Sequence, residues 1–244
     1  MVSMDQSAKW QNYVINIDSS EDRFTHFSRL NARYGREVQR VSAVTPTNTD
    51  LSQAIYVSRS VAACWESHLK VLRLFLQSDN NFAFVQEDDS ILKKFELNAY
   101  VDFMKNNSLD FLQVGYLYGT IGRKVEILGK NLLHISLLTL KVIFSCLRPS
   151  SSINEKVLVR EIFTNRTNLV PADVRAGTHA YLISRHLAEH VIQMNKPIFL
   201  AADDYFMALS RMRSFSMYRL LKSKARQGSW TSTVVPNVVP KRYS

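Results

Sequence analysis

A short apolar run that ends in three consecutive carboxylates constrains the fold of this chain more than any other stretch. Phe82–Val85 has the composition of a buried strand, and Glu87, Asp88 and Asp89 follow it after one glutamine. A strand of an α/β sheet delivers its carboxyl end to the ligand crevice. Adjacent acids repel one another, so they do not favour folding unless a cation or a hydrogen-bonding ligand is present. Alone, the stretch fits a ligand site or a solvated acidic turn equally well.

The composition is that of a folded chain with material for one large α/β domain. Of its 244 residues, 46% are hydrophobic and 21% are charged, which argues against disorder. The net charge of +10 favours an anionic partner: nucleic acid, acidic lipid headgroups or a phosphorylated substrate. Cys64 and Cys146 lack metal-type spacing and are predicted to be reduced thiols. The first residues hold no apolar signal core, so we expect a cytoplasmic protein.

The first 44 residues predict a β-turn-α-β opening. Tyr13–Ile17 reads as a strand, and Asp18–Asp22 supplies helix-capping residues and first-turn acids. A helical stripe follows and ends at Gly35, and 37–44 alternates as a second strand. No Gly-x-Gly-x-x-Gly follows the first strand, which argues against a standard dinucleotide site or a P-loop. The opening indicates a nucleotide-binding α/β fold of another kind.

A strong helix is expected directly before the acid-tipped strand. Apolar residues recur at three- and four-residue spacing from Val61 to Leu76, and Ser60 can cap this helix. The helix is predicted to be a crossover that brings Phe82–Val85 into a parallel sheet. His68 lies on its apolar face, where a hydrogen-bonded core histidine and a site residue are both possible.

The later segments alternate between predicted helices and strands. We expect a helix over 92–107, a strand over 111–117, and a Gly turn with His179 that enters a strand. Residues 120–170 are predicted to be a helical insertion in a domain spanning 1–221, and 222–244 a basic, irregular tail.

The segment 130–148 has a narrow basic stripe on an otherwise apolar surface. The apolar stretch is short for a bilayer and Lys141 interrupts it, which excludes a transmembrane span. Two interpretations stay open: a helix in the interface of an anionic membrane, or an insertion helix packed on the domain. The first would put the protein peripherally on the inner face of the membrane.

One further motif matches the signature of a metal site. His186, Glu189 and His190 match the His-x-x-Glu-His signature of inverted zinc peptidases. No glutamate occurs after Glu189 to serve as the distant third ligand, so we interpret the match as chance and keep a zinc peptidase only as a remote alternative. Nucleic-acid modules with interleaved aromatics are absent, and no nucleic-acid partner is expected.

The remaining constellation is the triple acid with His179 and an isolated acid at Asp203. Mg²⁺ and Mn²⁺ prefer carboxylate oxygens. A triple carboxylate at a strand end, a later histidine and a separate acid match the needs of metal-assisted glycosyl transfer. A metal neutralises the departing nucleoside diphosphate, and a separate carboxylate removes the proton from the acceptor hydroxyl.

Four blocks of the chain resemble glycosyltransferase family 25, which includes bacterial lipooligosaccharide β-galactosyltransferases and collagen galactosyltransferase domains. The blocks run in the family's order along most of the chain, and two positions depart from its pattern: Ala63 replaces a glycine, and Ala201-Ala202 replaces a proline-containing lead-in. The blocks are 14–18 with Asp22-Arg23, 40–44, 64–69 with 85–89, and 177–184 with Ala202-Asp203.

The resemblance implies a GT-A-like α/β fold with a mainly parallel central sheet. It also implies an inverting glycosyltransferase that moves a sugar, most often galactose from UDP-galactose, to a hydroxyl of a glycan or glycolipid acceptor such as lipopolysaccharide. By this resemblance, the metal (Mn²⁺ or Mg²⁺) would be bound by Glu87, Asp88 and Asp89. The nucleotide-sugar donor would be bound by Asn16, Asp18, Glu87, Asp88 and His179. The catalytic base would be Asp203, with Asp204 as the second candidate.

A second hypothesis comes from a different functional class. A non-catalytic peripheral membrane or polyanion-binding protein on the same fold would explain the charge and the basic segment 130–148. It would leave Glu87, Asp88 and Asp89 without a cation to hold, so the enzyme is the preferred interpretation.

Overall fold

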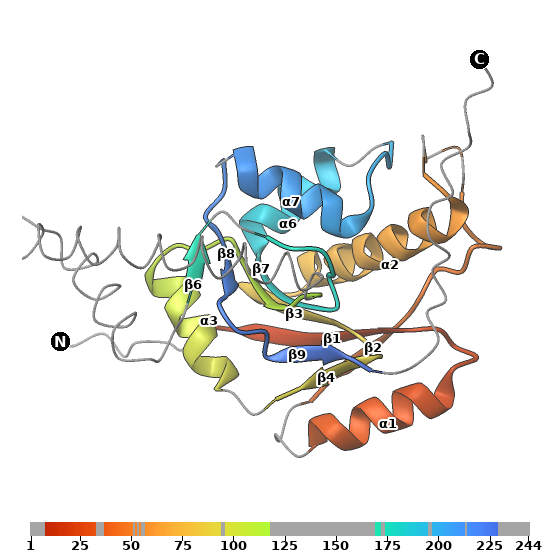
Figure 1. Ribbon diagram of the computed structural model, residues 1–244, viewed down its shortest axis with the longest axis horizontal. Helices are drawn as coiled ribbons and strands as arrows, with labels where there is room; N and C mark the ends of the chain where they lie inside the picture. Colours follow the sequence, from red (N-terminus) through yellow and green to blue (C-terminus); the bar gives the residue numbers. More distant parts are fainter. Residues whose placement is uncertain are drawn as a thin grey trace, which may run out of the picture.

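The computed structural model of this chain describes residues 8–32, 37–50, 52, 54, 57–93, 96–117, 169–171, 174–194, 197–212 and 214–228. They form a nine-stranded sheet with helices on both faces (Figure 1). The segment 118–168 lies outside the described residues. It includes all of 130–148 and most of the expected insertion. Within the described part of the chain, no helix is long and apolar enough to cross a bilayer.

The predicted β-α-β opening and the crossover helix are confirmed. Strand β1 (Trp10–Asn16) leads through α1 (Glu21–Ala32) to β2 (Gln39–Ser42), which pairs with β1 in parallel. Helix α2 (Arg59–Leu76) then returns the chain to β3 (Phe82–Glu87), which pairs in parallel with the other edge of β1. The acid-tipped strand therefore lies beside the first strand of the chain, and both end at the same edge of the sheet.

The remaining elements complete the sheet and its two helical layers. The helix predicted over 92–107 begins later than expected, at Leu97. Leu92 instead belongs to a strand that pairs with Ala225–Gln227. These elements are β4 (Ser90–Leu92), α3 (Leu97–Asn106), β5 (Phe111–Gly115), β6 (Leu169–Pro171), β7 (Ala180–Ser184), α6 (Arg185–Met194), α7 (Ala202–Met212), β8 (Met217–Leu220) and β9 (Ala225–Gln227).

The α/β class is confirmed, and the sheet is mixed. The main strand order is β2-β1-β3-β7-β5-β8-β6. The pairings β1–β2, β1–β3, β5–β8 and β5–β9 are parallel, whereas β3–β7, β5–β7, β4–β9 and β6–β8 are antiparallel. The parallel part that the sequence predicts is thus the half built from β1, β2 and β3.

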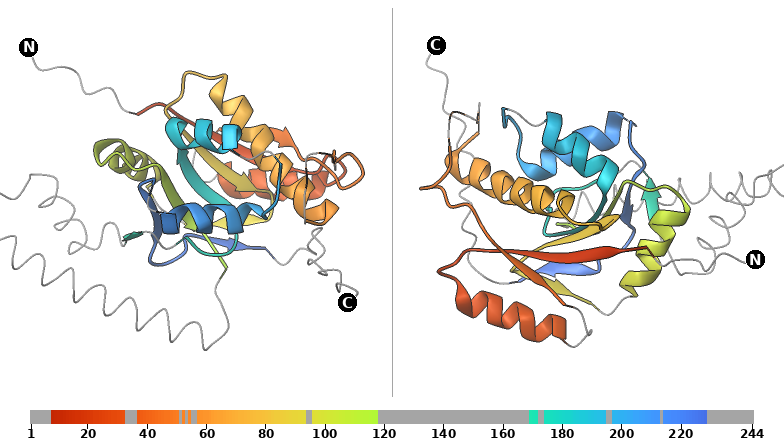
Figure 2. Two further views of the ribbon diagram at one scale, coloured as in Figure 1. Left: turned by 90° about the horizontal axis from the view of Figure 1, so that it is seen from above. Right: turned by 180° about the vertical axis from the view of Figure 1, so that it is seen from behind.

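Side chains of the central strands alternate between two buried layers, as strand geometry requires. Figures 1 and 2 show α2, α6 and α7 on one side of the sheet and α1 and α3 on the other. Tyr181 and Ile183 of β7 face the first side, where Trp65 of α2 packs. Ala180 and Leu182 face the second, where α3 packs. The sheet is therefore packed between two cores, one on each face.

The C-terminal part of the sheet extends past the expected domain boundary at residue 221. Residues 222–244 are predicted to be an irregular tail, but Ala225–Gln227 forms β9, which pairs with both β4 and β5. Ala225 is buried against the α3 side of the sheet. The folded unit therefore continues to at least Gln227, since buried contacts and ladder hydrogen bonds outweigh the polar composition of this segment.

The cap of α2 gives a stability prediction that separates two serines. The side chain of Ser58, rather than that of Ser60, accepts the hydrogen bond from the Val61 amide at 3.3 Å. Ser58→Ala should lower the free energy of unfolding by about 1 kcal/mol, measured by urea denaturation. Ser60→Ala is the matched control and should change it by less than about 0.5 kcal/mol. Equal losses in both variants would contradict the assigned cap.

Candidate functional site

The parallel pairing of β1 and β3 brings Asn16 and the acidic turn together. The Asp88 amide donates to the Ile15 carbonyl at 3.1 Å, which continues the ladder one residue beyond the strand. The Asn16 side-chain amide donates to Oδ2 of Asp88 at 2.6 Å and to the Ser20 carbonyl at 3.1 Å. Asn16 is buried, and its Oδ1 has no hydrogen-bond partner. One predicted donor residue therefore lies directly against the acids.

Asp88 is held by a cation and an amide. The guanidinium of Arg23, in the first turns of α1, forms an ion pair with Oδ1 of Asp88. The same guanidinium lies 3.9 Å from Oδ2 of Asp89. Because Asn16 takes the other oxygen of Asp88, both oxygens of this carboxylate accept bonds within the protein.

Asp89 retains an oxygen that nothing in the described residues satisfies. Its Oδ2 accepts from the Gln227 side chain at 2.9 Å, and its carbonyl accepts from the Gly228 amide at 2.7 Å. Its Oδ1 is buried without a hydrogen-bond partner. An orphaned, buried carboxylate oxygen is costly unless a ligand takes it up. Of the three acids, Asp89 best fits a role in binding a cation.

Glu87 points toward α2. Its Oε1 lies 3.5 Å from Nε2 of His68, whose Nδ1 lies 3.0 Å from the Tyr181 hydroxyl. His68 is fully buried. His68 is therefore both a hydrogen-bonded core histidine and a residue that contacts an acid of the site, which are the two interpretations that the sequence leaves open.

The three carboxyl groups have different pKa values because their partners differ. Burial raises the pKa of Asp89 to about 6, with the charge of Glu87 adding to the effect. Burial also raises the pKa of Asp88, against the opposing effect of Asn16 and Arg23. Burial also acts to raise the pKa of Glu87. The hydrogen bond and charge of His68, with the charges of His179 and Arg23, outweigh that effect, so the pKa of Glu87 is lowered. Glu87 is thus the acid that stays ionised most readily.

His179 is fixed next to the acidic turn by the sheet. Its carbonyl accepts from the Glu87 amide at 3.0 Å where β7 runs antiparallel to β3. Its ring is buried, Nε2 has no hydrogen-bond partner, and burial lowers its pKa against the opposing charge of Glu87. A Cβ at Gly115 would lie 2.7 Å from Nε2 and Cδ2 of this ring. Gly115 is therefore a glycine because the imidazole occupies the space beside it.

The candidate catalytic acids begin α7. Oδ2 of Asp203 accepts from the Gly177 amide at 3.1 Å, and Oδ1 accepts from the Asp204 amide at 3.0 Å. Gly177 has a φ of 95°, a left-handed conformation that favours glycine. Asp204 is exposed, and partial burial together with Asp203 raises its pKa. The structure thus joins Asp203, but not Asp204, to the loop that carries His179.

Asp18 lies at the rim rather than against the acids. Its Oδ1 accepts from the Ser42 hydroxyl at 2.7 Å, and Arg40 lies 3.9 Å away. Its side chain is 72% exposed. Asp18 therefore ties the ends of β1 and β2 together and remains accessible to a ligand.

An open pocket lies over the carboxyl ends of β1, β2 and β3. Its space is about 590 Å³ with the solvent-filled mouth included. Apolar residues at the strand ends line one wall, and the first turns of α2 line the other. The lining residues that carry polar side chains are Arg23, Ser60, Cys64, Ser67, His68, Glu87 and Asp88.

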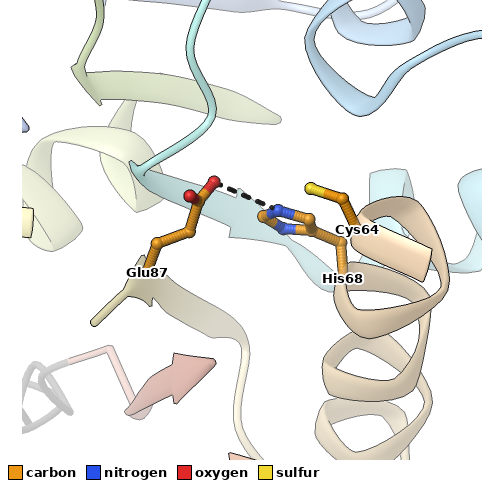
Figure 3. Close-up of side chains that lie close together, drawn as sticks. All are labelled: Cys64, His68 and Glu87. Carbon is orange, nitrogen blue, oxygen red and sulfur yellow. Dashed lines mark ion pairs between the residues drawn. The ribbon is translucent and has the colours of Figure 1, made fainter. Parts of the chain in front are cut away.

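Three of these side chains form a compact cluster, shown in Figure 3. One ligand atom each from Cys64, His68 and Glu87 lies within 4.8 Å of the other two. Burial and the carboxylates of Glu87, Asp203 and Asp89 raise the pKa of the Cys64 thiol. Asp203 is not among the residues that line this pocket.

The zinc-peptidase motif does not form a metal site among the described residues. His186 Nδ1 lies 3.0 Å from Oδ1 of Asp110, and the rings of His186 and His190 both pack against Phe215. Neither histidine belongs to a group of ligands close enough to share an ion. The motif is explained by structural contacts.

Three residues of the site receive no site role from the sequence. Arg23 belongs to a block that resembles the family, and a cation in the first turn of a helix opposes the helix dipole, which is a signal for a nearby acid. Gln227 gives no signal, because its role depends on the position of β9. Cys64 also belongs to such a block and is predicted to be a reduced thiol, although its spacing of four from His68 places both on one helical face.

Comparison with known proteins adds a family and a remote structural likeness. A family model described as glycosyltransferase family 25 (LPS biosynthesis protein) matches residues 9–207. A search of curated proteins gave no match. Among solved structures, the crystal structure of A197 from STIV is similar over 89% of this chain and 83% of that chain, with 15% sequence identity and a TM-score of 0.45.

The raised pKa of Asp89 predicts a pH-dependent stability. A carboxyl group whose pKa rises to about 6 on folding binds protons more tightly in the native state. It therefore lowers the free energy of unfolding as the pH rises from about 4 to above 6. In metal-free buffer, Asp89→Asn should raise that free energy at pH 7.5 by up to about 2 kcal/mol, measured by urea denaturation.

The gain should shrink as the pH falls toward 4, where the native carboxyl group is already neutral. Asp79→Asn, at an exposed turn position, is the control and should change the free energy of unfolding by less than about 0.5 kcal/mol at either pH. A constant gain across the pH range would contradict the assignment to Asp89.

Proposed function

Since the chain belongs to glycosyltransferase family 25, we propose that it transfers a sugar from a UDP-sugar to a hydroxyl group of a glycan acceptor. Galactose is the proposed sugar, and the reaction inverts the configuration at the sugar carbon. The family's description as an LPS biosynthesis protein favours an acceptor on lipopolysaccharide or lipooligosaccharide, or on another surface polysaccharide.

The observation that carries this proposal is the pocket at the carboxyl ends of β1 and β3, bordered by the acidic turn. Ligands of open α/β sheets bind at this edge. Asn16 and Asp18 can accept from the nucleoside hydroxyls and Arg23 can donate to a phosphate. The exposed rim position of Asp18 and the unpartnered Oδ1 of Asn16 support a polar ligand between them.

The acidic turn also supports a divalent cation at the diphosphate. Glu87 and Asp89 would hold Mn²⁺ or Mg²⁺, because Asp89 has an unpartnered, buried oxygen and Glu87 has a lowered pKa. Asp88 would instead fix Arg23 at the edge of the pocket. His179, with its unpartnered Nε2, is a further candidate for the metal or the donor. The cation would neutralise the charge that develops on the departing diphosphate.

Asp203 is the proposed catalytic base. Its carboxylate removes the proton from the acceptor hydroxyl while that oxygen attacks C1 of the sugar. The bond from C1 to the diphosphate oxygen breaks on the opposite face, which inverts the configuration. The Gly177 amide fixes the orientation of the Asp203 carboxylate. Asp204 is the second candidate.

The alternative function, a non-catalytic membrane or polyanion binder, has no supporting contact among the described residues that is comparable to the pocket and its acidic turn. Its main sequence feature is 130–148, outside the described residues. A membrane or polyanion binder would also leave the orphaned oxygen of Asp89 without a role.

Metal-dependent binding of UDP tests the donor and cation assignments. Calorimetry should detect UDP binding that strengthens at least tenfold on addition of Mn²⁺. Asp89→Ala should abolish this gain and metal-dependent transfer, because it removes the unpartnered oxygen. A folded Asp89→Ala protein with wild-type turnover would overturn the assignment, and UDP affinity that ignores Mn²⁺ would favour a metal-free site.

The catalytic base is tested by comparing two neighbouring acids. Asp203→Asn keeps an oxygen for the Gly177 amide but loses the base, so transfer should fall by about 10² to 10⁴ while UDP affinity is unchanged. Transfer is measured with a panel of UDP-sugars and lipooligosaccharide acceptors. Asp204→Asn is the matched comparison, and a larger loss in that variant would move the base to Asp204.

A further inference from the structure

Cys64, His68 and Glu87, here termed the thiol cluster, form a group whose thiol has no part in the proposed transfer. The cluster lines the inner wall of the pocket, where α2 approaches the end of β3. Cys64 is a free thiol, and among the described residues no other group of three histidine, cysteine or acidic side chains has its ligand atoms within 4.8 Å of one another.

The local structure explains why these ligand atoms converge. Cys64 and His68 are four residues apart on α2, so their side chains lie on the same face of the helix, one turn apart. Glu87 is delivered from the opposite side by the carboxyl end of β3. Figure 3 shows the three side chains directed toward one space between helix and strand. The cluster therefore depends on regular elements rather than on a loop.

His68 supplies an independent indication of a ligand. It is fully buried, and its Nε2 faces Oε1 of Glu87 at 3.5 Å, too far for a close hydrogen bond. Its other nitrogen contacts the Tyr181 hydroxyl at 3.0 Å, and the two rings stack with centroids 5.7 Å apart. Metal-binding histidines are usually fixed in this way, by a partner on the nitrogen that does not bind the metal.

We propose that Cys64, His68 and Glu87 bind Zn²⁺, with the fourth coordination position open to the pocket. A thiolate, an imidazole and a carboxylate are all ligands of zinc, and sites with three protein ligands leave one position for water or a small ligand. Binding requires loss of the Cys64 proton.

The donor set distinguishes this ion from the one proposed at the diphosphate. Mn²⁺ and Mg²⁺ prefer oxygen ligands, whereas a thiolate with an imidazole selects zinc. Glu87 belongs to both sets, so the two ions compete for one carboxylate. That competition rests on the proposed function, but binding of Zn²⁺ to the thiol cluster does not.

Cobalt spectroscopy tests the site without any measurement of transfer. Untagged, metal-stripped protein is titrated with Co²⁺, which reports thiolate ligation by a charge-transfer band in the near ultraviolet. The wild-type protein should develop this band with one Co²⁺ per chain and lose it when Zn²⁺ is added. Cys64→Ser should remove the band, whereas Cys146→Ser, which alters the other cysteine of the chain, should retain it.

Tyr181→Phe tests the geometry without changing a ligand. It keeps the stacked ring but removes the hydroxyl on Nδ1 of His68, so Co²⁺ and Zn²⁺ affinity should fall by about tenfold or more. Cys64→Ala provides a second ligand variant if the serine variant fails to fold, as judged by circular dichroism. Absence of the band in the wild-type protein, or its persistence in a folded Cys64 variant, would overturn the proposal.

Discussion

Mutual repulsion among three adjacent carboxylates is the constraint on which this site depends. The fold meets it by giving each acid a partner from a different element: His68 of α2 for Glu87, Arg23 of α1 for Asp88 and Gln227 of β9 for Asp89. The acids are thereby separated in pKa and in orientation. Neighbouring residues of one turn can therefore serve different functions, because their environments differ more than their chemistry.

The two-layered core makes this arrangement possible. Alternating strand residues pack against α2, α6 and α7 on one face and against α3 on the other, which holds the strand ends in place. The same packing buries Asp89 and His179 with unpartnered atoms. Such buried polar groups lower stability in the absence of a ligand. Buried acids with raised pKa values, such as Asp88 and Asp89, are typical of functional sites.

Sequence periodicity predicted the N-terminal half of the fold, where neighbouring elements in the chain also pair in space. The β-α-β opening, the crossover helix and the acid-tipped strand have clear periodicity, and the structure contains all of them. The antiparallel insertion of β7 between β3 and β5, and the pairing of β9 with β4, join residues far apart in sequence. No short pattern carries that information. The partner of Asp89 could not be predicted for the same reason, whereas Arg23 and Cys64 lay within reach of helix geometry.

The pairing of β4 with β9 also has a consequence for the order of assembly during synthesis. A ribosome releases the acidic turn and β4 long before it releases Gln227 and Gly228, which bond to the side chain and carbonyl of Asp89. Domains generally fold as units, and β3 lies between β1 and the much later β7. The acidic turn gains its last protein partner only when β9 docks, so the emerging chain carries an incomplete site until then.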